Sequence, residues 1–101
     1  MARRLKKRYV ALRAEPEAPA EKVFNAIRET YLELFGVLGL AEASLKHYKA
    51  YGKVVVGCSL GSLPRLLLAS AAVTKIDDTP SALRVLLISG TLRRVREESY
   101  L

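Results

Sequence analysis

The sequence has very few of the residues that form covalent cross-links or metal sites. It contains one cysteine, one histidine, one methionine and no tryptophan among 101 residues. A single cysteine, Cys58, cannot form an internal disulfide, and no pair of cysteines or histidines has a zinc-binding spacing. We therefore expect a protein of the reducing cytoplasm that binds no metal and no cofactor of its own.

Long hydrophobic runs are also missing. No segment approaches the roughly 20 apolar residues that span a bilayer, and the short stretch after the basic N-terminus is interrupted by Arg13. We expect no membrane segment. Half of the residues are nevertheless hydrophobic and 27% are charged, which is too apolar for a disordered chain. We predict one domain, with a basic N-terminal extension over residues 1–7, a core over 8–96 and a tail over 97–101.

Acidic residues are outnumbered, and the basic excess is uneven. Seventeen lysines and arginines against ten acids give a net charge of +7. Such an excess favours a polyanionic partner. One basic cluster precedes residue 9, and a second comes just before Glu97 and Glu98. If the first and last strands are antiparallel neighbours, the two basic clusters lie at one edge of the sheet.

The hydrophobic pattern predicts six elements. Alternation over 8–14 indicates a strand, and three- and four-residue spacing after Pro19 indicates a helix that Gly36 and Gly39 end. The remaining segments read as a polar strand over 44–51, a buried strand over 54–58, a helix over 63–74 and a long strand over 83–92. The order β-α-β-β-α-β predicts an α+β fold: a ferredoxin-like or RRM-like four-stranded antiparallel sheet with two helices on one face.

The last predicted strand has apolar side chains on both faces. Simple alternation places Leu83, Val85 and Leu87 on one side and Leu86, Ile88 and Leu92 on the other. The sheet face without helices would therefore expose large apolar groups, which favours a protein partner there. The predicted protein interface consists of Tyr9, Ala11, Leu83, Val85 and Leu87.

The one catalytic motif in the sequence lacks the context that its chemistry requires. Residues 57–61 match G-x-S-x-G, but that hydrolase motif belongs to a much larger fold in which the histidine follows the nucleophile, whereas His47 precedes Ser59. Two glycines and two serines between a strand and a helix are also typical of a helix cap. Cys58 lacks a base partner and is interpreted as a small buried hydrophobe. His47 is interpreted as a surface or RNA-contacting residue. We predict no catalytic residue.

Two further site hypotheses are weak. Asp77 and Asp78 could bind a metal, but adjacent acids before Thr-Pro are a common turn composition. Acylphosphatases share the predicted strand order, but they carry a glycine-containing loop with an arginine after the first strand. Here that loop is Glu15-Pro16-Glu17, and the single asparagine, Asn25, lies on a predicted helix.

The sequence favours phosphate contacts over base stacking. The strand beginning near Gly52 carries no aromatic residue through Gly57, so the stacking typical of RNA-recognition motifs is not expected there. Arginine and lysine contacts to phosphates remain. They give salt-dependent affinity and suit a folded RNA that is recognised by shape.

Several segments resemble one family along nearly the whole chain, from about residue 7 to 96. They are Arg8-Tyr9-Val10, Ala26-Ile27-Arg28, Leu32-Glu33-Leu34-Phe35-Gly36, Gly39-Leu40-Ala41 and Ser89-Gly90-Thr91-Leu92-Arg93. In this order they look like the archaeal and eukaryotic ribonuclease P protein subunit of the Pop-five type, also called component two. The sequence differs from the family pattern at Gly57, where the family often has an arginine. This puts an RNA contact at position 57 in doubt, and we expect Lys53 or Arg65 to supply the positive charge instead.

The resemblance implies a non-catalytic subunit of a ribonucleoprotein endoribonuclease. The RNA, using magnesium, would remove the 5′ leader of precursor tRNA, and the protein would bind and stabilise that RNA. The implied partners are ribonuclease P RNA and a TIM-barrel subunit of the Rpp-thirty type, with assembly as a dimer of heterodimers. Contacts to RNA are predicted for Arg3, Arg4, Lys6, Lys7, Arg8, Lys46, Lys53, Arg65, Arg93, Arg94 and Arg96. The alternative is a ferredoxin-like protein-interaction subunit whose basic tail only improves solubility.

Overall fold

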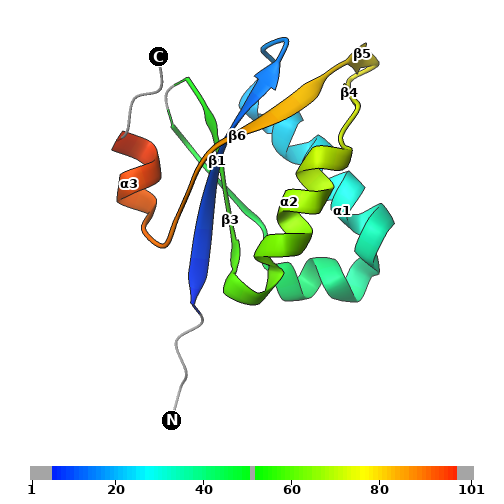
Figure 1. The fold of residues 1–101 in the computed structure, drawn as a ribbon. Helices are drawn as coiled ribbons and strands as arrows, with labels where there is room; N and C mark the ends of the chain where they lie inside the picture. Colours follow the sequence, from blue (N-terminus) through cyan, green and yellow to red (C-terminus); the bar gives the residue numbers. More distant parts are fainter. Residues whose placement is uncertain (1–5, 51, 98–101) are drawn as a thin grey trace.

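The computed structural model describes residues 6–50 and 52–97, which form a mixed α+β fold (Figure 1). No helix in these ranges is long and apolar enough to cross a membrane. The elements in chain order are β1 (Lys7–Glu15), α1 (Ala20–Ala43), β2 (Lys46–Tyr48), β3 (Val54–Ser59), the 3-10 turn η1 (Leu60–Ser62), α2 (Leu63–Ala72), β4 (Lys75–Ile76), β5 (Thr79–Pro80), β6 (Ala82–Ser89) and α3 (Leu92–Glu97).

Four strands form one antiparallel sheet in the order β2-β3-β1-β6. The first strand is therefore an interior strand, and its Val10 lies opposite Val56 of β3 and Ile88 of β6. Helices α1 and α2 lie together on one side of this sheet (Figure 1). The predicted α+β class with a four-stranded antiparallel sheet is confirmed.

The main core lies between the sheet and these two helices. β1 contributes Val10, Leu12 and Ala14, because alternate side chains of a strand point to the same face. Full burial of a large apolar side chain stabilises the fold by about 1.5–3 kcal/mol, so this layer supplies most of the driving force. The other buried members of the cluster are Val23, Ile27, Tyr31, Ala43, Val54, Val56, Cys58, Leu66, Ala69, Val73 and Ile76.

Helix α1 bends at one of the two glycines that were expected to end it. Gly36 has φ 76° and ψ 179°, outside the helical region, but the helix resumes and ends only at Ala43. Glycine adopts this positive φ without the steric cost that other residues have. The predicted stop was therefore correct as a break and wrong as an end. The bend leaves Val37 and Leu38 mostly exposed to solvent.

The last strand is shorter than predicted. β6 ends at Ser89, and residues 92–97 form the short helix α3 instead of continuing the strand. The reversal lies at Ser89-Gly90-Thr91, where the Thr91 amide donates a hydrogen bond to Ser89 Oγ at 3.2 Å. Helix α3 lies on the side of the sheet opposite α1 and α2 (Figure 1). The sheet thus has helices on both faces, whereas the sequence predicted them on one.

A second core forms beneath α3. Val95 is fully buried, and it packs with Ala11 of β1 and Val55 of β3, which are also fully buried. Tyr9, Tyr48, Ala50, Leu86, Leu87 and Leu92 are partly buried around these three residues. The apolar groups that the sequence left facing water are therefore partly covered by the chain itself.

We expect the substitution Val95→Ala to lower the free energy of unfolding by about 1–3 kcal/mol, because it removes buried methyl groups and leaves a cavity. Val37→Ala is the matched control, since Val37 also lies in a helix but is 73% exposed. The control should change stability by less than about 0.5 kcal/mol. Urea denaturation of both variants measures the difference, and equal losses would mean that α3 does not contribute to the folded core.

Candidate nucleic-acid interface

The sheet face that α3 crosses carries a row of three basic residues. Arg13 of β1 lies directly opposite Arg84 of β6. Lys53 comes directly before Val54, the β3 residue that pairs with Leu12, and it lines the same cavity as Arg13. Lys53 is 9% exposed and Arg84 is largely exposed. Glu15 Oε1 lies 3.9 Å from Arg84 Nη1, an exposed pair that contributes little stability. We call Lys53, Arg13 and Arg84 the basic row.

A second row on the same face is aromatic. Lys46, Gly57 and Tyr9 occupy matching positions on β2, β3 and β1, and Tyr48 extends from the neighbouring position of β2 toward them. The rings of Tyr9 and Tyr48 meet edge to face, with centroids 5.5 Å apart. Lys46 Nζ lies 5.6 Å from the centroid of the Tyr48 ring, within range of a cation–π interaction. We call Lys46, Gly57, Tyr9 and Tyr48 the aromatic row.

Helix α3 passes between these rows. Its Val95 packs on Ala11 and Val55, which lie between the two rows along β1 and β3. Arg93 and Arg94 of α3 are exposed. The chain reversal at Gly90 therefore brings the second basic cluster over the sheet face. β1 and β6 are antiparallel neighbours, and Ser89 at the end of β6 lies opposite Tyr9 near the start of β1. The arginines that follow, however, fold back over the sheet in α3 and do not stay at that edge.

The other residues predicted to contact RNA lie elsewhere. Arg8 lies opposite Cys58 and so faces the helix layer, and Arg65 of α2 lies over the Phe35 ring at 5.5 Å. Lys6 and Lys7 are exposed at the start of β1. Arg3 and Arg4 fall outside the described residues, and Arg96 lies within α3 without a described side chain. Strand alternation thus separates neighbours that the sequence grouped together, and the RNA assignments remain predictions.

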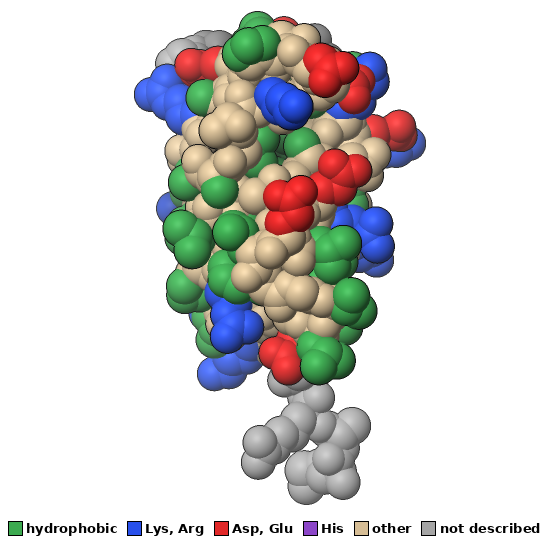
Figure 2. Space-filling view, turned by 90° about the vertical axis from the view of Figure 1, so that its right-hand side faces the viewer, with side chains coloured by type: hydrophobic (Ala, Val, Ile, Leu, Met, Phe, Trp, Pro, Cys, Tyr) green, Lys and Arg blue, Asp and Glu red, His purple; other side chains and the backbone are tan. Residues whose placement is uncertain are grey.

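The helix face has a different character. Glu21, Glu29 and Glu33 are exposed on α1, and Figure 2 shows acidic side chains over the middle of this face with hydrophobic and basic side chains around them. Dense phosphate is repelled by such a surface. Among the described surfaces, the face that α3 crosses is therefore better suited to a polyanion.

The residues predicted for a protein interface do not share one face. The pairing of β1 with β6 shifts between Ala11 and Leu12, so that Leu86 is an extra residue in β6. A bulge of this kind reverses the facing of every residue beyond it. Leu83 therefore packs against the main core, and Leu87 joins Tyr9 and Ala11 beside α3.

The prediction that Leu83, Val85 and Leu87 share one face was therefore wrong, because simple alternation does not allow for the bulge. Val85 lies opposite Leu12 on the helix side and is 40% exposed, whereas Ala11 is fully buried. Ala11 is therefore unavailable to a partner while α3 stays in place. A contact with a protein partner stays a prediction for Tyr9, Val85 and Leu87.

The serines of the G-x-S-x-G segment fasten two elements together. Ser59 Oγ lies 3.1 Å from the Glu42 carbonyl oxygen and 2.9 Å from Ser62 Oγ, which joins the end of β3 to the end of α1. His47 stacks on Phe24 of α1, with ring centroids 5.4 Å apart, and its Nε2 is buried without a hydrogen-bond partner. The hydroxyls are thus engaged with backbone and serine, and the imidazole packs against the helix layer.

The two adjacent aspartates form a turn, as predicted. Asp77 and Asp78 have φ of 49° and 65° between the paired strands β4 and β5. Aspartate tolerates this left-handed region better than most residues. Asp77 Oδ2 also forms an ion pair with Lys22 of α1. Within residues 6–50 and 52–97, no cluster of three or more histidine, cysteine or acidic side chains could hold a metal ion.

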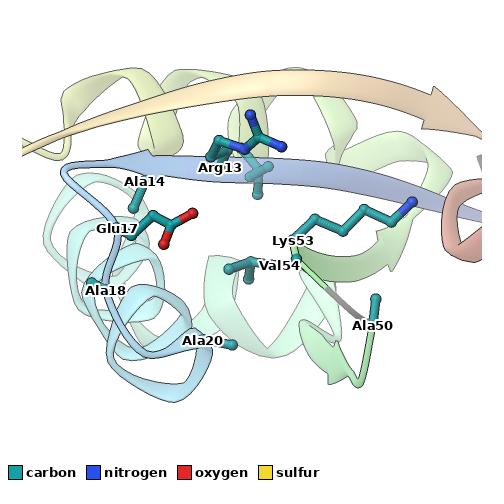
Figure 3. Close-up of a pocket in the computed structure, with 10 residues that line it drawn as sticks. Arg13, Ala14, Glu17, Ala18, Ala20, Ala50, Lys53 and Val54 are labelled. Carbon is teal, nitrogen blue, oxygen red and sulfur yellow. The ribbon is translucent and has the colours of Figure 1, made fainter. Parts of the chain in front are cut away.

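A cavity of about 210 Å³ lies where β1 leaves the sheet. Arg13, Glu17 and Lys53 line it together with alanines and the start of β3 (Figure 3). The Glu17 carboxylate points into the space, while the long stem of Lys53 runs along β1 toward α3 (Figure 3). The Glu17 carboxylate offsets part of the positive charge of Arg13 and Lys53, so this cavity adds no phosphate site to the basic row.

These features define a small basic α+β protein whose sheet face suits a polyanionic partner. Residues 8–100 match the model of the Rpp14/Pop5 family. The chain belongs to this family, and the resemblance inferred from the sequence is confirmed.

Curated relatives and a solved structure agree with this assignment. Ribonuclease P protein component 2 of Methanosphaerula palustris is 35% identical over 99 residues, covering 92% of this chain and 61% of the relative. The chain therefore spans less than two thirds of that relative's length. The protein of the same name from Methanosarcina mazei is 28% identical over 98 residues, covering 94% of this chain and 84% of that relative.

A chain in the cryo-EM structure of yeast ribonuclease MRP has the same fold, with a TM-score of 0.58 over 92% of this chain and 80% of that chain, at 11% identity.

The aromatic row and α3 were not predicted from the sequence. Tyr9 and Tyr48 lie far apart in the chain and on strands other than the one inspected for aromatic residues. The signal for α3 was the Ser-Gly-Thr reversal followed by Leu92 and Val95 at three-residue spacing. Both features depend on which residues the sheet brings together.

Burial favours the protonated form of the Cys58 thiol. It raises the pKa of Cys58 from 9.0 to about 11, and the nearby Arg8 guanidinium opposes this only in part. Near pH 8, we expect Cys58 in the folded protein to react with a disulfide reagent roughly a hundredfold more slowly than in the urea-unfolded chain, because the thiolate is the nucleophile.

The same pKa shift predicts a pH dependence of stability. The thiol's contribution to folding is fully present below pH 9.0 and is lost as the pH rises toward about 11, because the unfolded chain releases its proton first. Cys58→Ala should remove this part of the alkaline decline. A decline that is unchanged in the variant would assign it to other groups.

Proposed function

We propose that this protein is a non-catalytic subunit of ribonuclease P, which binds the catalytic RNA and stabilises its active fold for 5′-leader removal from precursor tRNA. Family membership and the names of the curated relatives support this assignment. The observation that carries it is the exposure of Arg84 on β6 and of Arg93 and Arg94 on α3 on one face of the sheet, beside Arg13 of β1.

The mechanism is electrostatic. A folded RNA brings phosphates close together, and their repulsion opposes the compact form. Lysine and arginine side chains on one protein face neutralise these phosphates and release condensed counterions. The protein thereby lowers the concentration of magnesium that the RNA needs, and the magnesium belongs to the RNA. The protein itself binds no cofactor in this mechanism and supplies no catalytic group.

We also propose that the fold is ferredoxin-like and that the protein works in the cytoplasm. The strand order β2-β3-β1-β6, with α1 and α2 on one face, supports a ferredoxin-like arrangement that α3 extends. The single cysteine is free and buried, which fits a reducing cytoplasm.

We further propose a TIM-barrel subunit of the Rpp-thirty type as the protein partner, in a dimer of heterodimers. Exposed apolar groups on the helix side of the molecule support a protein contact there. Leu68 of α2 is 57% exposed, and Val85 and Ile88 on the helix face of the edge strand β6 are 40% and 39% exposed. Water-exposed apolar side chains grouped on contacting elements are typical of interaction surfaces.

Cleavage of precursor tRNA tests the proposed function directly. We expect the source organism's ribonuclease P RNA, at limiting magnesium, to cleave faster when this protein and its TIM-barrel partner are both added, and the required magnesium concentration to fall. Each protein added alone is the control. No gain with both proteins folded and associated would favour the alternative, a protein-interaction module with a solubilising basic tail.

The salt dependence of RNA binding tests the electrostatic mechanism. Removing both exposed arginines of α3, in the variant Arg93→Ala/Arg94→Ala, should lower the slope of log affinity against log salt by about 1–2. The matched control is Arg28→Ala/Lys75→Ala, which removes two exposed charges from α1 and β4. The control should leave the slope nearly unchanged. Equal effects of both variants would show that net charge, and not this face, governs binding.

A further inference from the structure

The aromatic row contains two tyrosine rings in contact, which the proposed phosphate contacts do not involve. Tyr9 and Tyr48 both lie on the basic sheet face, and each ring is only partly buried although its neighbours Ala11 and Val55 are fully buried. Partly buried rings beside cations are an arrangement with which proteins hold unstacked nucleobases, because a base stacks on an aromatic ring while its phosphates meet the charges.

Gly57 makes the close approach of the two rings possible. A Cβ atom at this position would lie 2.7 Å from Tyr48 Cε2 and 3.3 Å from Tyr9 Cδ1 and Cε1. Any other residue would therefore push the Tyr48 ring off the sheet. The two tyrosine rings therefore meet over the backbone of β3 at Gly57. The absence of an arginine at position 57 is explained by this packing.

Charge surrounds the rings on the same face. Lys46 reaches over the Tyr48 ring, and Lys7 lies two residues before Tyr9 on the same side of β1. Both lysine side chains are exposed. A nucleotide whose base stacks on the tyrosines would have cations within reach of its flanking phosphates.

We propose that Tyr9 and Tyr48, seated on Gly57, form a stacking site for an unpaired base of the bound RNA. This inference rests on the proposed RNA-binding function and adds a ligand class to it. Stacking is tolerant of base identity because every base has a π face, so the site selects unpaired nucleotides and not a sequence. Beside α3, Tyr9 and Tyr48 stay partly exposed, whereas Ala11 and Val55 are fully buried.

A pair of probes with equal charge separates stacking from electrostatics. One probe is a short single-stranded oligoadenylate, and the other is an abasic oligomer of the same length and phosphate number. We expect the wild-type protein to bind the base-bearing oligomer at least about fivefold more tightly, the lower end of what one stacked base contributes. Upfield shifts of the Tyr9 and Tyr48 ring protons in NMR spectra should accompany its binding.

Three variants assign that preference to the aromatic row. Tyr48→Leu keeps an apolar side chain against the second core but removes the ring, and Gly57→Ala keeps the ring but displaces it. Both should bring the affinity ratio of the two probes close to one. Tyr48→Phe is the matched control, and it should keep the wild-type ratio. Thermal unfolding identifies the fully folded variants, and Tyr9→Leu replaces any variant that does not fold.

The outcomes distinguish failure of the stacking site from failure of the proposed RNA-binding function. Equal affinity of the wild-type protein for both oligomers, together with tight binding of folded ribonuclease P RNA, would overturn the stacking site and leave the proposed function intact. A preference that survives in both Tyr48→Leu and Gly57→Ala would also overturn it. Failure to bind the folded RNA and both oligomers would contradict the proposed function itself.

Discussion

The alternation of side chains along β1 is the constraint on which the rest of the structure depends. This strand is paired on both edges, so its backbone is fixed and its side chains must divide between two faces. Val10, Leu12 and Ala14 enter the main core, and Tyr9, Ala11 and Arg13 enter the opposite face. A shift of one residue would bury Arg13 beneath α1 and α2 and remove Leu12 from the main core, so the register is strongly specified.

The same alternation gives the protein two surfaces with different chemistry. The helix layer presents charges of both signs together with apolar groups, which is less favourable for dense phosphate than a face of one positive sign. The opposite face presents the basic row, the aromatic row and the arginines of α3. In the proposed function these two surfaces meet different partners, RNA on one face and protein on the other, and their separation would keep the partners from competing.

Helix α3 has two effects that oppose each other. Val95 removes Ala11 and Val55 from water, which stabilises the sheet but takes away the apolar surface that was expected to meet a partner. The helix also carries Arg93 and Arg94 onto the face and so raises its positive charge density. The outcome is a face that is less apolar and more basic than the strands alone would provide.

Much of the fold followed from the sequence itself. Composition, the period-two pattern of residues 8–14 and the three- and four-residue spacing after Pro19 indicated the class of fold and the order of the main elements, because these signals are local and repeated. The family was indicated by the resemblance of particular segments, such as Ser89-Gly90-Thr91-Leu92-Arg93. The break at Gly36 was visible, but whether the helix resumed was not. Tertiary structure alone decided the bulge at Leu86, the return of α3 over the sheet and the meeting of Tyr9 with Tyr48 over Gly57. Each of these depends on pairing between distant segments, and burial in a particular neighbourhood outweighs local preference there.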